Sequence, residues 1–338
     1  MAYVDLSQDA GAVRRILLAL GLARAGEAVR AVALTGGVSS GIYRVDLASG
    51  SYCIKQALPQ LKVAKVWRVP VERVFSEIAY LRTVQRIVPG HVPRVLGEDA
   101  ATASFVMPFL GAEYRNWKSE LLAGHVAPEL ARTVGDVLGR IHAATADRPE
   151  IAAGFATDAN FHALRLEAYL VETAQVHPAL ARRLHAIVDR TASTRRVLVH
   201  GDVSPKNILV GPHGPVLLDA ECAWFGDPAF DVAFCLNHLL LKCLWTPRTT
   251  LDFLACFDAL AATYLAGIVW ERPAGLEARA AHLLPGLFLA RVDGKSPVEY
   301  ITTDHDRNRV RRVARTLLAQ PVQTLAEVRQ AWSKELTA

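Results

Sequence analysis

One segment constrains this chain more than any other: HGDVSPKNILVGPHGPVLLDAE, residues 200–221. Its two short apolar stretches, 207–210 and 215–219, flank the turn GPHGP and predict a pair of strands. Four oxygen-bearing side chains lie among these apolar residues: Asp202, Asn207, Asp219 and Glu221. Because charged groups are rarely buried without a partner, the segment predicts that these oxygens share a bound ion or ligand.

The four side chains are suited to a hard divalent cation. Mg²⁺ prefers one or two carboxylates together with phosphate oxygens and water. Phosphoryl transfer needs that ion, an acidic residue beside the attacking hydroxyl, and a cation on the donor phosphates. Asp202 begins a loop, Asn207 follows it, and Asp219 ends the next strand. The segment therefore meets the first two needs.

The cation is expected nearer the N-terminus. The stretch TGGVSSG, residues 35–41, lies between predicted strands at 29–34 and 41–47. Its glycines and serines could cover phosphates, and the candidates are Gly36, Gly37, Ser39 and Ser40. A third strand, 52–56, carries Lys55, and the helical pattern at 70–88 carries Glu77, which could hold that lysine. Alone, this glycine pattern is equally typical of a hairpin turn; followed by Lys55 and Glu77, it favours a phosphate site.

The secondary-structure pattern changes along the chain. A helix at 9–20 and a short buried strand at 104–109 complete a small sheet region. Helical spacing then dominates, at about 115–123, 127–145, 160–174, 178–192, 229–243, 250–269, 277–290 and 305–318. We expect an α+β protein of two lobes: a nucleotide-binding lobe at 1–107, a hinge at 108–111 and a helical catalytic and substrate lobe at 112–338. The cleft should lie between them.

Composition narrows the classes of protein. No apolar run approaches the roughly 18 residues of a membrane span, and residues 1–12 lack the basic start of a signal peptide. The five cysteines form no CxxC pair, which favours reduced thiols in a cytoplasmic protein. We expect no membrane partner.

The net charge is +5, and the densest basic run lies between Arg307 and Arg315. No aromatic residues interleave that run, so we expect no nucleic-acid partner. Two interpretations of it remain open, namely a solvated helix face and a site for an anionic ligand.

At this point the sequence resembles the aminoglycoside phosphotransferase and choline kinase superfamily, which are small-molecule kinases with a protein-kinase-like fold. HGDVSPKN resembles the catalytic loop, LLDAE the metal-binding Asp-x-Glu, and GDPAFDVA, residues 226–233, the segment that follows. The stretch CIKQALPQLKVAKVWRVPVERVFSEIAYL and the stretch RNWKSELL are most similar to parts of methylthioribose kinase.

The resemblance implies a role for each matched residue. Asp202 would be the catalytic base or would orient the acceptor hydroxyl, and Lys55 with Glu77 would hold the donor phosphates. Asn207 and Asp219 would bind Mg²⁺, with Glu221 assisting. Asp231 would anchor the catalytic loop, and His200 would be a hydrogen-bonded scaffold residue. Many protein kinases have a lysine where this chain has Ser204, so Lys206 either contacts the γ-phosphate or faces solvent.

VMPFLG, residues 106–111, fits a hinge that binds adenine. Pro108 keeps a carbonyl group but has no N–H, so it would accept a hydrogen bond from adenine while Leu110 donates one. A proline that merely ends a strand is the alternative. ATP is the expected phosphate donor, and GTP stays open.

The acceptor is expected to be a small hydroxylated molecule, because the few residues between Glu221 and Asp227 leave no room for a peptide-docking segment. Arg291 and Lys295 favour a neutral or anionic acceptor, such as a sugar or sugar-like metabolite, over a polycation. Three hypotheses remain: a metabolite kinase, an antibiotic phosphotransferase, and a nucleotide-binding module without catalysis. The sequence leaves the oligomeric state open.

Overall fold

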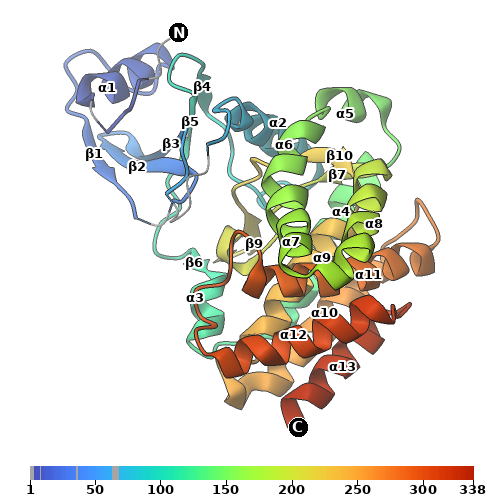
Figure 1. Ribbon diagram of the computed structural model, residues 1–338. Helices are drawn as coiled ribbons and strands as arrows, with labels where there is room; N and C mark the ends of the chain where they lie inside the picture. The colour runs from blue at the N-terminus through green and yellow to red at the C-terminus, as the bar shows by residue number, and fades with distance from the viewer. Residues whose placement is uncertain (1–3, 8, 36, 63–67) are drawn as a thin grey trace. The chain divides into compact units, whose positions relative to one another are not determined.

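The computed structural model describes residues 4–7, 9–35, 37–62 and 68–338. Gly36, one of the expected phosphate-loop residues, lies outside this range, as do residues 63–67 of the lysine-bearing segment. The chain divides into two compact units, Met1–Tyr114 and Arg115–Ala338, whose elements are labelled in Figure 1. The assignment of 108–111 as a hinge stays a prediction.

The first unit is built on an antiparallel sheet whose described strands have the order β1-β2-β3-β5-β4. These strands are β1 Arg30–Ala33, β2 Ser40–Leu47, β3 Gly50–Ala57, β4 Gly97–Asp99 and β5 Ser104–Pro108. Two helices, α1 Ala10–Ala19 and α2 Arg73–Ile87, accompany the sheet. The predicted strands and both predicted helices are confirmed, and β4 is an addition.

Alternation along the strands separates the two faces of this sheet. On one face an apolar cluster joins α1 to the strands, and its members include Leu6, Val13, Ile16, Leu17, Tyr43, Val45, Ile54 and Val106. Lys55 follows Ile54 on β3, so its side chain belongs to the opposite face, where α2 contacts β3 and β5. The sheet therefore directs the predicted phosphate-binding lysine away from the apolar cluster and toward α2.

The second unit is mainly helical. Its longer helices are α4 Pro128–Thr145, α8 Ala181–Ser193, α9 Ala229–Lys242, α10 Thr250–Ala266, α11 Pro273–Asp293, α12 Asp304–Ala319 and α13 Leu325–Thr337. Shorter turns are α3 Trp117–Leu122, α5 Pro149–Gly154, α6 Asp158–Phe161, α7 Glu172–Val176, η2 Pro178–Leu180, η3 Pro205–Asn207 and η4 Pro247–Thr249. A π-helical segment, η1 His162–Val171, joins α6 to α7.

Helix α9 lies at the centre of this unit. All of its residues are buried, and it contacts both α10 and α11. Two small antiparallel sheets lie among the helices. One has the strand order β6-β8-β9, with β6 Arg115–Asn116, β8 Ile208–Gly211 and β9 Gly214–Leu217, and the other pairs β7 Val197–Val199 with β10 Trp224–Gly226. The predicted strand pair within 207–219 is thus confirmed as β8 and β9, while β7, β10, α5 and α13 were not predicted.

By length and composition alone, the segment Pro247–Ala266 could cross a membrane. This finding is weak evidence, because a core helix of a soluble protein passes the same test. Here α10 contacts α4 and α9 and buries side chains such as Phe253, Phe257 and Tyr264. By length and composition, the expectation that no run is long and apolar enough was wrong for this segment. Its contacts with α4 and α9 are those of a core helix.

All five cysteines are free and buried. Burial raises the pKa of the Cys53, Cys243 and Cys256 thiols to about 12. Since the thiolate is the reactive form, these groups act as small apolar side chains.

Candidate active site

Lys55 and Glu77 form a buried ion pair in the first unit. The Lys55 ammonium donates to both carboxylate oxygens of Glu77, at 2.8 and 2.7 Å. The two side chains are only 6% and 4% exposed. The structure thus brings the predicted pair together, with the lysine fixed by the helix that follows its strand.

The turn between β1 and β2 is held by its backbone. The Ser39 carbonyl accepts from the Leu58 amide at 3.0 Å and from the Arg73 guanidinium at 2.6 Å. A Cβ atom on Gly37 would lie 2.4 Å from the Ser40 carbonyl oxygen, so this position requires glycine. Ser39 and Ser40 are buried. The order that these contacts impose is what a phosphate-covering turn needs.

The predicted hinge begins at Pro108, the last residue of β5, and continues into the residues that follow the strand. Pro108 is opposite Tyr52 in the sheet, and the next amide, that of Phe109, donates to the Ser51 carbonyl at 3.1 Å. Pro108 and Leu110 are both half-buried. Their contact with adenine stays a prediction.

In the second unit, Asp231 of α9 holds the start of the segment 200–207, which resembles a catalytic loop. Its carboxylate accepts hydrogen bonds from the amides of His200 and Gly201, at 2.7 and 2.8 Å. Gly201 has φ +79°, and a Cβ there would lie 2.6 Å from the Cys222 carbonyl oxygen, so this tight approach also requires glycine. The predicted anchoring by Asp231 is seen directly in these two bonds.

His200 is fixed as a neutral scaffold residue. Its Nδ1 accepts from the Asp202 amide at 3.1 Å, so the ring proton is on Nε2, which lies 3.1 Å from the Leu218 carbonyl oxygen. Burial lowers the pKa of this imidazole below its ordinary value, although neighbouring aspartates oppose the shift. The ring therefore ties the loop to the residue that follows β9.

Asp202 is 3% exposed, and its two carboxylate oxygens differ sharply. Oδ2 lies 2.8 Å from the Asn207 amide nitrogen, 2.9 Å from Arg165 and 3.2 Å from Lys206. Within the described part of the chain, Oδ1 is buried and receives no hydrogen bond. A carboxylate with one oxygen held and the other without a partner is suited to accept a hydrogen bond from the hydroxyl of a bound acceptor.

Arg165 is a site residue that sequence reasoning missed. It lies on η1, is 6% exposed, and donates from Nε to the Gly201 carbonyl at 2.5 Å as well as contacting Asp202. Burial is the largest single influence and disfavours its charge, but Asp202 together with neighbouring groups such as Glu221 raises the pKa of the guanidinium. The available signal was one arginine among buried apolar residues, and that pattern alone does not indicate its partner.

Lys206 and Ser204 differ in exposure. The Lys206 side chain is 49% exposed while it contacts Asp202. Ser204 is fully buried, and its hydroxyl has no partner among the described residues. The Lys206 ammonium thus lies against the Asp202 carboxylate and does not project freely into solvent.

The β8–β9 pairing brings two predicted metal ligands, Asn207 and Asp219, close together. The Leu218 amide donates to the Asn207 carbonyl at 2.8 Å, so Asp219 follows immediately beside Asn207. Asp219 has φ +67°, a left-handed conformation that aspartate tolerates better than most residues. The Asn207 amide nitrogen is bonded to Asp202, which leaves its oxygen for other ligands.

These donors fit a hard cation by their chemistry. Asn207, Asp219 and the buried Glu221 offer amide and carboxylate oxygens, the ligands that Mg²⁺ prefers. No group of three or more His, Cys, Asp or Glu able to hold a metal occurs among the residues described. Mg²⁺ in such a site commonly takes its other ligands from phosphate and water.

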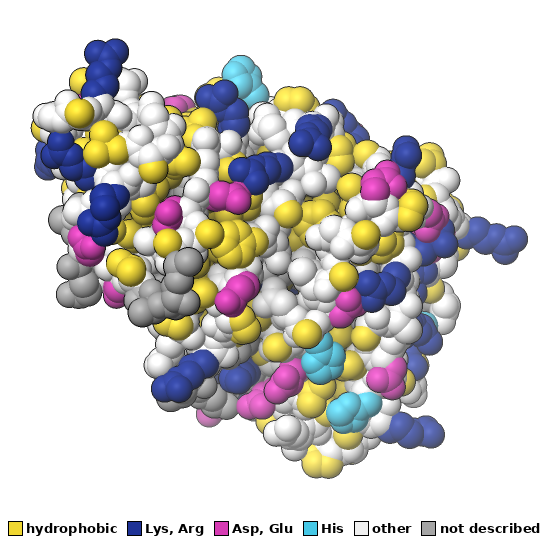
Figure 2. All heavy atoms as spheres, turned by 90° about the horizontal axis from the view of Figure 1, so that it is seen from above, with side chains coloured by type: hydrophobic (Ala, Val, Ile, Leu, Met, Phe, Trp, Pro, Cys, Tyr) yellow, Lys and Arg dark blue, Asp and Glu magenta, His cyan; other side chains and the backbone are white. Residues whose placement is uncertain are grey.

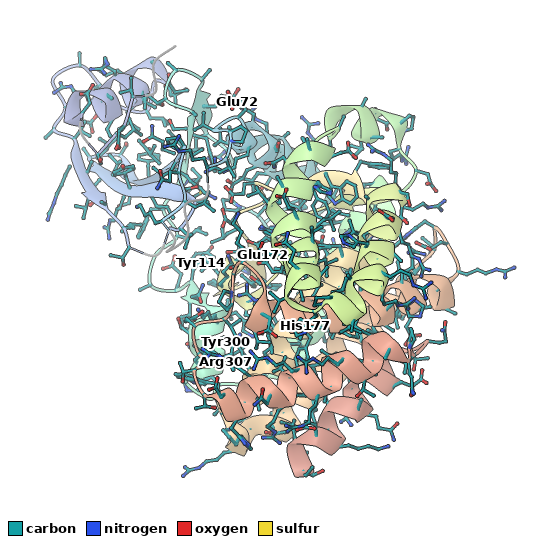
Figure 3. All side chains as sticks on the ribbon, viewed as in Figure 1. Glu72, Tyr114, Glu172, His177, Tyr300 and Arg307 are labelled. Atoms are coloured by element: carbon teal, nitrogen blue, oxygen red, sulfur yellow. The ribbon has the colours of Figure 1, made fainter. Side chains whose placement is uncertain are left out.

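Four of the five arginines of the C-terminal basic run lie against carboxylates within the protein. Arg311 pairs with Asp293 at 2.6 Å, and Arg309 and Arg312 both contact Glu335. Arg307 lies 3.5 Å from Asp304, and Arg315 contacts His177, labelled in Figure 3. On the face shown in Figure 2, Lys and Arg side chains are dispersed among other groups. These contacts favour the interpretation of the run as a helix face, and a site for an anionic ligand there stays a prediction.

Arg291 and Lys295 lie at the end of α11 and just after it. Arg291 is 8% exposed and donates to the Tyr169 hydroxyl at 3.2 Å. The Lys295 amide donates to the Ala168 carbonyl at 3.1 Å, and its side chain is half-buried. Both residues thus adjoin η1, the element that carries Arg165.

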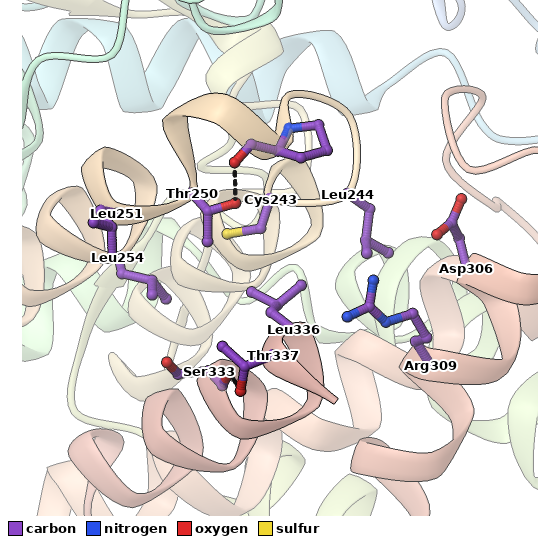
Figure 4. Close-up of a pocket in the computed structure, with 11 residues that line it drawn as sticks. Cys243, Leu244, Thr250, Leu251, Leu254, Asp306, Arg309, Ser333, Leu336 and Thr337 are labelled. Atoms are coloured by element: carbon purple, nitrogen blue, oxygen red, sulfur yellow. Dashed lines mark hydrogen bonds between the residues drawn. The ribbon is translucent and has the colours of Figure 1, made fainter.

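A pocket of ≈ 300 Å³ lies elsewhere in this unit, among α10, α12 and α13 (Figure 4). Leu244, Leu254 and Leu336 contribute apolar walls, and Arg309, its one arginine, is already paired with Glu335. It contains none of the predicted site residues, so it is not a candidate for the phosphoryl-transfer site.

The chain belongs to the phosphotransferase enzyme family, whose match extends over residues 30–276. It is 28% identical over 215 residues to methylthioribose kinase from Pectobacterium atrosepticum, covering 56% of this chain and 54% of that relative. The Cronobacter sakazakii methylthioribose kinase is 27% identical over 221 residues, covering 57% and 55%. The chain spans about half the length of the curated relatives it matches.

Solved structures show the fold. A Plasmodium vivax ethanolamine kinase aligns with a TM-score of 0.55 and 12% identity, covering 96% of this chain and 86% of that one. An amicoumacin kinase in complex with AMP-PNP, Ca²⁺ and Ami aligns with a TM-score of 0.55 and 13% identity, covering 89% and 91%. The α+β, protein-kinase-like fold class is therefore confirmed.

Proposed function

We propose that this protein transfers the γ-phosphate of ATP to a hydroxyl group of a small molecule. The observation that carries the proposal is Asp202, whose Oδ2 is fixed by Arg165, Asn207 and Lys206 while Oδ1 is left to receive a hydroxyl. Membership of the phosphotransferase family supports this reaction class.

The other predicted site residues would bind different parts of the phosphate donor, ATP. Lys55, held by Glu77, would bind the α- and β-phosphates, and the turn at Gly37, Ser39 and Ser40 would cover them. Pro108 and Leu110 would hold adenine through the backbone. Asn207, Asp219 and Glu221 would hold Mg²⁺, which when bound neutralises charge on the phosphate oxygens. Lys206, half-exposed beside Asp202, would contact the γ-phosphate in place of the buried Ser204.

The acceptor is proposed to be a sugar or a sugar-like metabolite. The methylthioribose kinase relatives support a sugar-like acceptor. Only five residues, 222–226, separate Glu221 from Asp227, and three of them form β10, which supports a small acceptor. Arg291 and the half-buried Lys295 are its proposed contacts. A cytoplasmic location is proposed from the five free, buried thiols.

A screen of ADP release tests this function. Purified protein with ATP and Mg²⁺ is expected to release ADP with at least one neutral or acidic sugar, and not with aminoglycosides. Omitting Mg²⁺ and adding a chelator should abolish the signal. Release with an aminoglycoside alone, together with antibiotic resistance on expression, would instead establish the antibiotic-inactivating enzyme.

The metal-site assignment predicts a specific effect of Asp219→Asn. Asparagine tolerates the left-handed backbone at this position, so the fold should persist while the metal loses a charged ligand. We expect the gain in ATP affinity produced by Mg²⁺ to fall at least about 10-fold. Calorimetric titrations with and without Mg²⁺ measure it.

The exposed Asp189→Asn on α8 is the matched control and should behave like the wild type. An unchanged Mg²⁺ effect in Asp219→Asn would remove Asp219 from the metal site.

A further inference from the structure

Two basic residues lie one turn apart on α9, within the second unit. His238 and Lys242 are four residues apart, so they lie on the same side of the helix. They are 6% and 1% exposed. Phe234, one turn earlier, contacts the His238 ring edge-on, with 5.4 Å between ring centres. This face of α9 therefore presents an aromatic ring followed by two buried basic groups.

Lys242 is buried without an acidic partner. Its Nζ lies 3.5 Å from the Tyr300 hydroxyl and 4.9 Å from the centre of the Tyr300 ring; Figure 3 labels Tyr300 on the segment that leads to α12. Neither Lys242 nor His238 forms an ion pair with any residue that the structure describes. An ammonium group removed from water without a counter-charge is costly, so this arrangement needs an explanation.

Two further basic residues accompany this pair. Arg291 of α11 donates to Tyr169 and Ser296, while its buried Nε has no partner among the described residues. Lys118 of α3 pairs with Glu299. We call Lys118, His238, Lys242 and Arg291 the cationic cluster. Among the described residues, Glu299 is the one carboxylate that pairs with a member of this cluster. The basic residues of the cluster therefore outnumber its acidic partners.

The basic groups of the cluster act on one another. Burial, followed by the charge of Lys118, lowers the pKa of Lys242 to about 7. Burial, followed by Arg291 and Lys242, lowers the pKa of His238 well below its ordinary value. The four side chains therefore share one electrostatic environment.

Aromatic rings connect the cluster to the base. The Arg291 guanidinium lies 5.6 Å from the centre of the Tyr169 ring, and that of Arg165 lies 6.0 Å from the same ring. Arg165 also lies 5.9 Å from Phe234, which contacts His238. Since Arg165 pairs with Asp202, the cluster is connected to Asp202 through the Tyr169 and Phe234 rings and then Arg165.

We propose that the cationic cluster binds an anionic group of the acceptor, a carboxylate or a phosphate, while Asp202 receives a hydroxyl of the same molecule. This inference rests on the proposed kinase function and names its substrate class: a hydroxylated acid such as a sugar acid or a sugar phosphate. The bound anion supplies the counter-charge that Lys242 lacks. Aminoglycosides and other polycations are repelled by the same charges.

A matched panel of acceptors tests the inference. Glucose, gluconate, glucose 6-phosphate and glucosamine have similar size and hydroxyl groups but differ in charge. ADP release is expected to be most efficient with gluconate or glucose 6-phosphate, and the preference between these two separates carboxylate from phosphate recognition. Equal or better kcat/KM with glucose or glucosamine would overturn the proposal.

Lys242→Met provides the variant, because methionine fills similar space without charge. We expect KM for the preferred acid to rise about 10–100-fold, with KM for ATP unchanged and with the melting temperature equal to or above that of the wild type. The control is Lys334→Met, on the exposed face of α13, which should change none of these values. An unchanged KM for the acid in Lys242→Met would overturn the proposal.

A binding measurement separates this inference from the kinase assignment. With AMP-PNP and Mg²⁺ present, inorganic phosphate should raise the melting temperature of the wild type above its value in chloride of equal ionic strength. Lys242→Met should lose this increase. If no acceptor supports ADP release but phosphate acts in this way, the proposed function fails and the anion site stands. Equal increases in both proteins, or none in either, would overturn the anion site.

The pH dependence of stability gives an independent test of Lys242. Its pKa is about 7 in the folded protein and about 10.4 when unfolded. Between these values the unfolded chain binds more protons, so the free energy of unfolding should rise with pH. Lys242→Met should lack this rise, and urea titrations at a series of pH values measure the difference. Parallel curves would show that the fold does not lower the pKa of Lys242, which would contradict its burial without a counter-charge. The charged and titratable groups that surround it are Lys118, Cys235, His238, Arg291, Glu299 and Tyr300.

Discussion

Asp202→Asn is expected to lower kcat on the identified acceptor by roughly 10²–10⁴-fold while ATP affinity stays unchanged. The variant keeps an oxygen that can face Arg165 and Asn207, but it cannot take up a proton from the hydroxyl. Steady-state kinetics measure the loss, and calorimetric titration of ATP with Mg²⁺ measures the affinity. Retention of more than about a third of wild-type activity would be incompatible with Asp202 as the base.

A second variant separates chemistry from stability. Neutralising Asp202 leaves the buried Arg165 without its counter-charge, which is destabilising. Asp202→Asn combined with Arg165→Met should therefore recover melting temperature without recovering turnover. If the double variant recovered both, the loss in the single variant would be structural. Asp189→Asn again serves as the surface control.

Asp231→Ala is expected to lower the free energy of unfolding by about 2–6 kcal/mol. The reason is that two buried amide donors, those of His200 and Gly201, would lose their acceptors, each at a cost of roughly 1–3 kcal/mol. Urea denaturation followed by circular dichroism measures the change. Asp231→Asn, which keeps one acceptor oxygen, should lose about half as much and remains measurable if the alanine variant does not fold.

The control for Asp231 is Asp136→Ala on α4. Asp136 is 53% exposed and lies 3.6 Å from Arg140, so its removal should have little effect. An Asp231→Ala variant as stable as Asp136→Ala would show that the start of the catalytic segment is held by other contacts.

The sequence predicted the residues whose spacing is local. The strands before and after the turn at 211–215 were recognisable from their apolar runs, and their pairing brings Asn207 beside Asp219. The pairing of Lys55 with Glu77 was also predictable, because a strand followed by a helix leaves few other partners for a buried lysine.

Other features depend on contacts that no local pattern encodes. Strands β4, β7 and β10 have three residues each, too few for alternation to be visible. Arg165 required knowledge that η1 lies beside the segment that carries Asp202. Helix α13, in contrast, had a readable signal, since Thr324 and Glu327 form a capping box at its start.

The buried thiols have a practical consequence. Because all five cysteines are enclosed and weakly acidic, a maleimide dye should react with them slowly in the folded protein. Exposed replacements such as Ala48→Cys in the first unit and Ala186→Cys in the second would then be the preferred labelling positions. A donor and acceptor dye at these positions would allow fluorescence energy transfer to compare the two units before and after ATP is added, with the native cysteines left in place.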